Sequence, residues 1–185
     1  MKISSRIVLL LLLLVATSFA GRKRDPLTDA EADQIREMAM DPGKRMRLYI
    51  KFTEARLESI DQLRADPKEA AGRGKRIHDL LEDFTALLDE INDNLDQYQG
   101  RPLEKDEKKD FHKALKEVVM AVDRYDSHLR MLKNAVQTDV QTRREADEFR
   151  FVLQDATEAL ASTRDMAREY STADAATEKE AEKKK

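Results

Sequence analysis

The sequence predicts an all-α protein: an elongated antiparallel four-helix bundle with coiled-coil-like heptad seams, preceded by a short N-terminal helix. Three observations support this prediction. Apolar side chains recur every three and four residues along most of the chain, only 5 Gly and 4 Pro interrupt it, and 38% of its residues are charged. This combination is typical of helices that have narrow apolar stripes and wide solvated faces.

The composition excludes several classes of function. The chain of 185 residues contains no cysteine, which excludes disulfides, Cys-ligated zinc, thiol catalysis and a bacterial lipid-anchored start. Its net charge of −3 provides no basic field for nucleic acid, which calls for a clustered basic face. The length is sufficient for one domain.

Residues 1–20 have the three-part layout of a secretory signal peptide. Two basic residues precede the apolar run 7–15, and Ser18-Phe19-Ala20 places small residues at both positions that a signal peptidase recognises. The segment 7–20 spans roughly 21 Å as a helix, which is shorter than the ~30 Å hydrocarbon core of a bilayer. We therefore expect cleavage after Ala20 and a location in the periplasm or outside the cell.

An uncleaved signal anchor is the alternative to this interpretation. Arg22, Lys23 and Arg24 follow the apolar run at once, and positive charge at that position resists translocation. In this case the protein would be an anchored envelope scaffold. Cleavage would remove only two basic residues, Lys2 and Arg6, and would leave 32 basic and 37 acidic side chains with a net charge of −5.

The first predicted helices follow a basic lead over residues 21–27. Thr28 and Glu31 form a capping box, in which each side chain satisfies a backbone amide of the first turn, and a short helix follows to about Met40. Asp41-Pro42 then provides an N-cap and a proline at the first helical position. The next helix is expected over 43–65. Its apolar side consists of Met46, Ile50, Leu57, Ile60 and Leu63, flanked by Tyr49 and Phe52.

Two long helices, 67–99 and 103–137, are expected to form the centre of the protein, separated at Gly100–Pro102. A hinge is predicted near Gly72 and Gly74, since each glycine weakens a helix by about 1 kcal/mol. One apolar ridge comprises Ile77, Leu81, Phe84, Leu88, Ile91, Leu95 and Tyr98, and the other comprises Phe111, Leu115, Val118, Val122, Tyr125, Leu129, Leu132 and Val136. We expect these two ridges to face each other across a hairpin.

The end of the fourth helix is predicted from an interruption of its ridge. Continuing the heptads reaches Asp139 and Arg143, and both are charged. Thr142 and Glu145 form a further capping box. We therefore expect a turn within 137–142.

The last predicted helix spans 142–170. Its apolar stripe consists of Phe149, Leu153, Ala156, Leu160, Thr163, Ala167 and Tyr170. Residues 171–185 contain no large apolar side chain, which predicts a disordered charged tail. The helical domain is thus expected over 28–170.

Two histidines suggest a possible metal site. Folding the hairpin about residue 101 places His78 near Arg124, with His128 one turn away. Two imidazoles and neighbouring carboxylates could ligate zinc or another divalent ion. Glu82, four residues after His78, equally provides an ordinary ion pair. The sequence contains no Glu-x-x-His and no His-Glu-x-x-His, the spacings of known di-iron and zinc sites. We expect no metal.

The remaining candidates are interpreted as structural. Glycines and cations in Gly72–Arg76 could cradle an anion at a helix start, but a hinge is the expected role. Tyr98 and Phe111 occupy ridge positions and are expected to fill the core. No serine lies in a Gly-x-Ser-x-Gly turn, so neither a catalytic site nor a cofactor is expected. One acidic run is expected to be a solvated face; it comprises Glu82, Asp89, Glu90, Asp93 and Asp96.

The segment Leu27-Thr28-Asp29-Ala30-Glu31 resembles the Leu-Thr-x-x-Gln starts of the helical periplasmic stress chaperones related to Spy and CpxP. Glu replaces Gln at the fifth position, the resemblance covers five residues, and the capping box accounts for it. The resemblance would imply that unfolded client proteins bind on a helical cradle.

Together these observations predict an exported helical protein with a structural or interaction role and no catalysis. Its expected partner is another protein or a second copy of itself. Neither nucleic acid nor stable membrane insertion is expected once the signal is cleaved. A periplasmic protein that binds a divalent metal or a small ligand near His78 and His128 is the alternative function.

We predict that the exported protein begins at Gly21, because the apolar segment is too short for an anchor. N-terminal sequencing and the intact mass of the protein recovered from the cell envelope test this directly. Recovery of a membrane-bound chain that retains Met1 would contradict it.

Overall fold

The structure, a computed structural model, describes residues 24–98 and 101–183, with side chains as far as Ala173. The predicted signal peptide lies outside these residues. The part of the chain that is described is all-helical and has no strand. None of its helices combines the length and the apolarity needed to cross a membrane.

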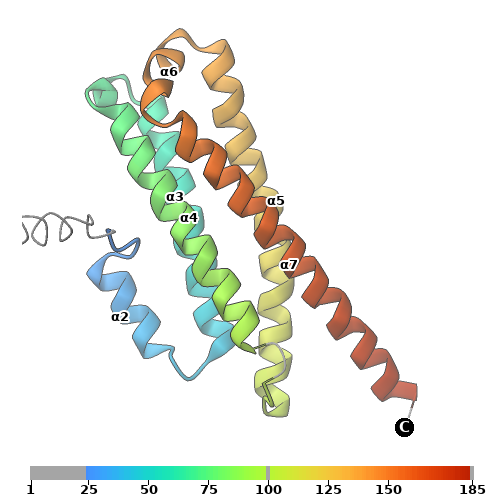
Figure 1. Cartoon of the computed structure of the whole chain (residues 1–185). Helices are drawn as coiled ribbons and strands as arrows, with labels where there is room; N and C mark the ends of the chain where they lie inside the picture. Colours follow the sequence, from blue (N-terminus) through green and yellow to red (C-terminus); the bar gives the residue numbers. More distant parts are fainter. Residues whose placement is uncertain (1–23, 99–100, 184–185) are drawn as a thin grey trace, which may run out of the picture.

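Four long helices and several short ones make up the described chain (Figure 1). The long helices are α3 (Pro42–Ala65), α4 (Arg73–Tyr98), α5 (Lys105–Thr138) and α7 (Arg150–Lys183). The short segments are α2 (Asp29–Glu37), the 3-10 turns η2 (Pro67–Ala70) and η3 (Ala146–Glu148), and α6 (Val140–Glu145). The predicted caps of α2 and α3 are confirmed: Thr28 and Glu31 form a capping box, and Asp41 accepts a hydrogen bond from the amide of Lys44 at 2.9 Å.

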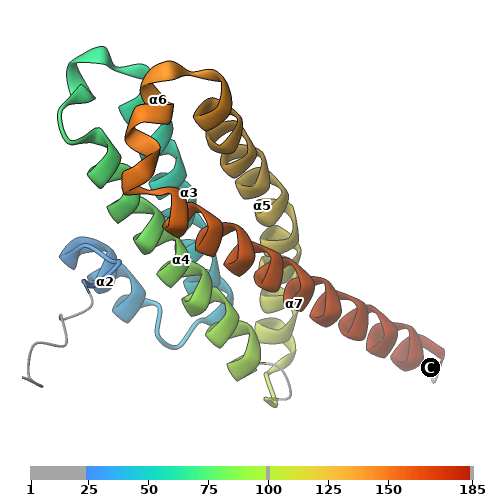
Figure 2. The same cartoon turned by 45° about the horizontal axis from the view of Figure 1, so that its top comes forward.

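The long helices pack in a ring. Helix α3 lies beside α4 and α5, and α7 lies beside the same two helices on the other side. Figures 1 and 2 show α7 crossing the others obliquely, with its C-terminal end standing away from them. Helices α4 and α5, which are consecutive in sequence, are not a closely packed pair in the described structure and occupy diagonal positions.

Helices α4 and α5 run antiparallel, as the sequence predicts, because Phe84 meets Tyr125 and Tyr98 meets Phe111; they differ from the predicted hairpin in lying diagonally and not side by side. Arg45 bonds Asn94 and Tyr49 bonds Glu90, so α3 and α4 run antiparallel. In the contacts between α3 and α5, the residue numbers increase together along both helices. The pairs are Arg47–Glu117 (3.0 Å), Glu54–Arg124 (2.9 Å) and Asp61–His128 (2.6 Å). These two helices are parallel because each runs antiparallel to α4, and they are neighbours because α5 lies next to α3 and diagonally across from α4.

The two ridges nevertheless meet in the centre. The rings of Phe84 and Tyr125 lie 5.8 Å apart in an edge-on contact, and those of Tyr98 and Phe111 lie 5.4 Å apart. Every ridge residue is buried except Val136, which is partly buried. Aromatic pairs in such geometries add to the stability that apolar burial provides. The ridges point at each other across the core, while α3 and α7 fill the two sides.

The predicted turn within 137–142 is confirmed, but the cap and the start of the last helix differ from the prediction. The break falls at Asp139, whose carboxylate accepts hydrogen bonds from the amides of Gln141 and Thr142. Thr142 is a buried residue within α6 and not a cap, and the last long helix starts at Arg150. Aspartate is among the best N-cap residues, so a charged residue that interrupts the ridge also starts the next segment.

The predicted disordered tail is instead helical as far as Lys183. Residues 171–183 are mainly Ala, Glu, Lys, Thr and Asp and contain neither Gly nor Pro. Ala, Glu and Lys are strong helix formers, so the helix can continue from its buried part without an apolar stripe.

The hinge before α4 is a tightly packed corner. Gly72 has φ +63°, a conformation that other residues rarely adopt. A Cβ on Gly74 would lie 3.0 Å from the carbonyl oxygen of Glu145, so glycine allows this backbone to approach α4 closely. Between the two glycines, the guanidinium of Arg73 binds both carboxylate oxygens of Glu145, at 2.8 and 2.9 Å.

Helix α2 is attached by charged contacts. Arg56 of α3 donates hydrogen bonds to Glu31 at 2.6 Å and to the carbonyl of Pro26 at 2.7 Å, and lies 3.7 Å from Asp83. Arg24 donates to Asp83 at 2.7 Å. Burial opposes ionisation of Glu31, but hydrogen bonds from Arg56 and Thr28 outweigh it and lower its pKa. At Asp83 burial dominates and raises the pKa.

We predict that Arg73→Ala lowers the free energy of unfolding by about 3 kcal/mol, because it leaves the Glu145 carboxylate partly buried and unpaired. The side chain of Arg73 is 4% exposed and that of Glu145 is 16% exposed. Urea unfolding measures the change.

Arg130→Ala is the matched control, since Arg130 is 77% exposed and pairs with Asp126 four residues earlier. An exposed pair of this kind contributes about 0.5 kcal/mol or less. Equal losses from the two substitutions would refute a special role for the buried pair.

Candidate functional site

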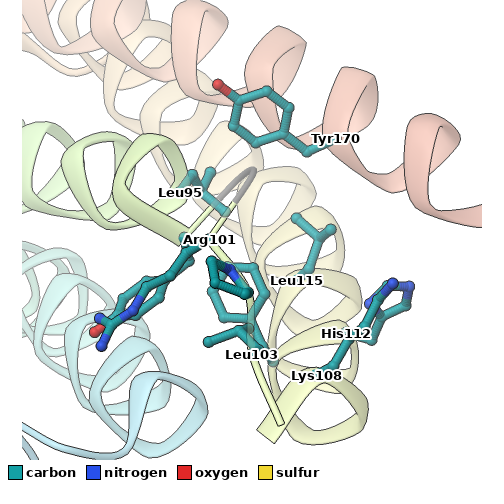
Figure 3. Close-up of a pocket in the computed structure, with 10 residues that line it drawn as sticks. Leu95, Arg101, Leu103, Lys108, His112, Leu115 and Tyr170 are labelled. Atoms are coloured by element: carbon teal, nitrogen blue, oxygen red, sulfur yellow. The ribbon is translucent and has the colours of Figure 1, made fainter. Parts of the chain in front are cut away.

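One candidate site is a cavity of about 340 Å³ at the end of the protein where α4 is connected to α5 (Figure 3). We call it the Tyr98 pocket. Its walls come from the end of α4, the segment 101–103, the first turns of α5 and one residue of α7. The lining residues are Leu95, Tyr98, Arg101, Pro102, Leu103, Lys108, Phe111, His112, Leu115 and Tyr170.

The base of the pocket is apolar because it is the last layer of the core. Leu95, Phe111 and Leu115 are ridge residues with 0%, 7% and 2% of their surface exposed. Among the described residues, no helix continues over the core at this end, since α4 is described as far as Tyr98 and α5 begins at Lys105. The pocket therefore combines a preformed apolar floor with access from solvent.

Cations surround Tyr98. The guanidinium carbon of Arg101 lies 5.6 Å from the centre of the Tyr98 ring, and that of Arg45 lies 5.5 Å from it. Cations at such distances are attracted by the negative face of an aromatic ring. Lys108 also lines the pocket, one turn into α5. In Figure 3, the side chains of Arg101 and His112 point to opposite sides of the pocket.

Tyr170 closes one side of the pocket from α7. Figure 3 shows it across the pocket from Leu103. Its hydroxyl donates a hydrogen bond to Asp96 of α4. This bond, together with burial and the negative charge of Asp96, raises the pKa of Tyr170 to about 12. The phenol therefore stays protonated at neutral pH and connects α7 to α4.

The two histidines singled out in the sequence are not brought together. His128 contacts Asp61 of α3, with 2.6 Å between Nδ1 and the carboxylate oxygen. His78 belongs instead to a group with Asp79 and Glu82, whose candidate ligand atoms all lie within 4.8 Å of one another. The expected position of His78 near Arg124 is wrong, because Arg124 pairs with Glu54 of α3 and α4 and α5 are diagonal.

Basic side chains already occupy part of the His78 group. Lys75 binds both carboxylate oxygens of Asp79, at 3.0 and 2.9 Å, and Arg24 donates to its backbone carbonyl at 2.8 Å. Burial raises the pKa of Asp79, but the hydrogen bond and charge of Lys75 outweigh burial and lower it. A metal ion would have to displace or tolerate these cations.

Other candidates from the sequence also have partners. Arg73 binds Glu145 and Arg76 binds Glu69, so the cations of the Gly72–Arg76 hinge are already paired with carboxylates. The acidic run on α4 is only partly a solvated face. Glu90 accepts a hydrogen bond from Tyr49 at 3.1 Å and Asp96 accepts one from Tyr170.

The sequence did not identify the Tyr98 pocket, because its aromatic residues were assigned to the core and its cations lie in a loop and on an exposed helix face. The one signal in the sequence was a cation next to the aromatic end of a ridge.

Comparisons with protein-family models, with curated proteins and with solved structures each found no match. A function for this chain is therefore inferred from its own geometry.

We predict that titration of Zn²⁺ into the mature protein gives no saturable heat, because Lys75 and Arg24 already bind Asp79 and would compete with the ion for it. Isothermal titration calorimetry of the unaltered protein and of His78→Ala measures this. A one-site isotherm that His78→Ala abolishes would overturn the prediction.

Proposed function

We propose that this chain is an exported helical protein with a structural or partner-binding role and no catalytic activity, which acts in the periplasm or outside the cell. The apolar leader before Gly21 supports export. The proposal includes a four-helix bundle with heptad seams, which the buried ridges and the ring of helix contacts support. The partner is another protein or a second copy of this chain.

The observation that carries the proposal is an exposed aromatic residue beside a groove. Phe151, in the first turn of α7, is 77% exposed, although the adjacent Val152 and Leu153 are 8% and 4% exposed. Val140, at the start of α6, is 62% exposed. Aromatic residues are frequent anchors in protein interfaces.

The groove lies between α5 and α7 and has a volume of about 440 Å³. Val136 and Leu153 provide apolar lining, and Lys133, Arg150 and Glu158 provide charges of both signs. Gln154 and Glu158, three and seven residues after Phe151 in α7, line the groove, and this spacing places the exposed ring on the same side of the helix. An apolar centre with a charged border is typical of interfaces between proteins.

A signal-anchored envelope scaffold would use the same surface, and recovery of the mature N-terminus distinguishes it from an exported protein. The client-binding cradle that the short resemblance implies would require an apolar concave face. Phe151 and its groove instead form a small surface with a charged border, which favours a defined partner.

We predict that a photo-reactive benzoylphenylalanine at position 151 cross-links, in the native cell, to one defined protein or to a second copy of the chain. The same photo-reactive residue at position 40 should give no such cross-link. Met40 is equally available, at 87% exposure, but it lies in the link between α2 and α3, away from the groove. Mass spectrometry of the cross-linked species identifies the partner.

Light scattering of the mature protein separates self-association from binding to another protein. Phe151→Asp should weaken the association by about tenfold or more, as expected for an aromatic anchor, and Met40→Asp should leave it unchanged. Identical cross-links from both positions would contradict the proposal.

A further inference from the structure

The geometry points to a ligand site in the Tyr98 pocket: it binds a small organic anion with an apolar body, of the class of a medium-chain carboxylate. The site is independent of the proposed partner surface, because the Phe151 groove involves the other end of α5 and the first turns of α7. Three features of the pocket carry this inference: its floor, its charge and its size.

The floor requires an apolar group. Leu95, Phe111 and Leu115 present core side chains to the cavity, and Tyr98 contributes an aromatic wall. Burial of apolar surface is the main source of favourable free energy when a ligand enters such a cavity. A small inorganic anion would leave this surface unused.

The charge around the pocket requires an anion. Neither Arg101 nor Lys108 has an ion-pair partner among the residues that the structure describes, and Arg45 binds only the neutral side-chain amides of Asn94 and Gln97 there. By contrast, several arginines that join the helices elsewhere bind a carboxylate, as Arg56 and Arg73 do. Within the described chain, three cations without acidic partners therefore gather at one end of a protein whose net charge is negative.

The acidic groups that face this region are engaged elsewhere. None of the described residues that line the pocket is acidic. Asp96 accepts the hydroxyl of Tyr170, and Glu104 and Glu107 form the capping box at the start of α5. A ligand carboxylate could approach Arg101 and Lys108 without meeting a free carboxylate from the described part of the protein. Charge-assisted hydrogen bonds to guanidinium and ammonium groups are about twice as strong as neutral ones.

The size of the cavity limits the ligand. Its volume of about 340 Å³ is near the lower end of the range for small-molecule pockets. A single short apolar chain or ring with one carboxylate fits this volume, whereas a two-chain lipid does not. Pockets between the helices of helical proteins are a common location for such ligands.

Sodium octanoate is the probe, titrated calorimetrically into the mature protein, with 1-octanol and octyltrimethylammonium as ligands that share the chain but lack the negative charge. We expect one saturable site for octanoate and at least about tenfold weaker binding of the two controls. Nuclear Overhauser effects from the octanoate chain to the rings of Tyr98 and Phe111 should place the ligand. Equal affinity for octanoate and 1-octanol, absence of saturation, or contacts to other rings would overturn the inference.

A pair of matched double variants tests the cations. Arg101→Gln with Lys108→Gln removes the two lining charges and should weaken octanoate binding by about tenfold or more. Lys109→Gln with Lys113→Gln removes two exposed charges of α5 that do not line the pocket, and it should leave binding unchanged. Lys108, Lys109 and Lys113 are exposed residues of α5, and Arg101 is also exposed. Both double variants should therefore fold, which thermal unfolding can verify. Equal losses in the two variants would refute the assignment.

Discussion

The contact between α4 and α5 across the centre of the protein is the constraint on which the other helix positions depend. Tyr125 shows why. Its ring meets Phe84 of α4 edge-on, and its hydroxyl donates a 2.8 Å hydrogen bond to the carbonyl of Ile50 in α3. The side chain is 1% exposed, and burial raises the pKa of its phenol. One residue therefore connects three helices, and its buried hydroxyl is satisfied only if α3 lies beside α5.

Charged pairs then determine which helices are neighbours. Apolar ridges are non-directional, and leucines and valines can pack in several registers. The pairs Arg47–Asp110, Arg73–Glu145 and Arg164–Asp126 connect α3 to α5, α4 to α6 and α7 to α5. Partly buried pairs contribute little net stability but penalise arrangements that leave a charge unpaired. They are a physical reason for the diagonal arrangement and for the parallel direction of α3 and α5.

Close packing adds a second constraint of this kind at Gly43. A Cβ at this position would lie 2.2 Å from a carboxylate oxygen of Asp110, which also binds Arg47. Glycine at the start of α3 therefore permits the approach to α5 that the ion pair requires.

Most charged side chains between the helices have a partner of opposite charge, and two features of the described chain differ from this: the exposed ring of Phe151, and the cations beside Tyr98 that have no acidic partner in it. They lie near opposite ends of α5, which allows one protein surface and one ligand pocket without interference.

Local periodicity and capping chemistry were enough to predict the helical class, the start of α2 and α3, the hinge at Gly72 and most of the buried apolar side chains, but not buried polar residues such as Arg56 and Asn94. These features depend on neighbours three or four residues away, which the sequence displays directly. The tertiary structure alone decided that α4 and α5 are diagonal, that His78 and His128 lie apart, and that loop cations border a cavity. These depend on which helix faces lie next to one another, and an apolar stripe does not specify its neighbour.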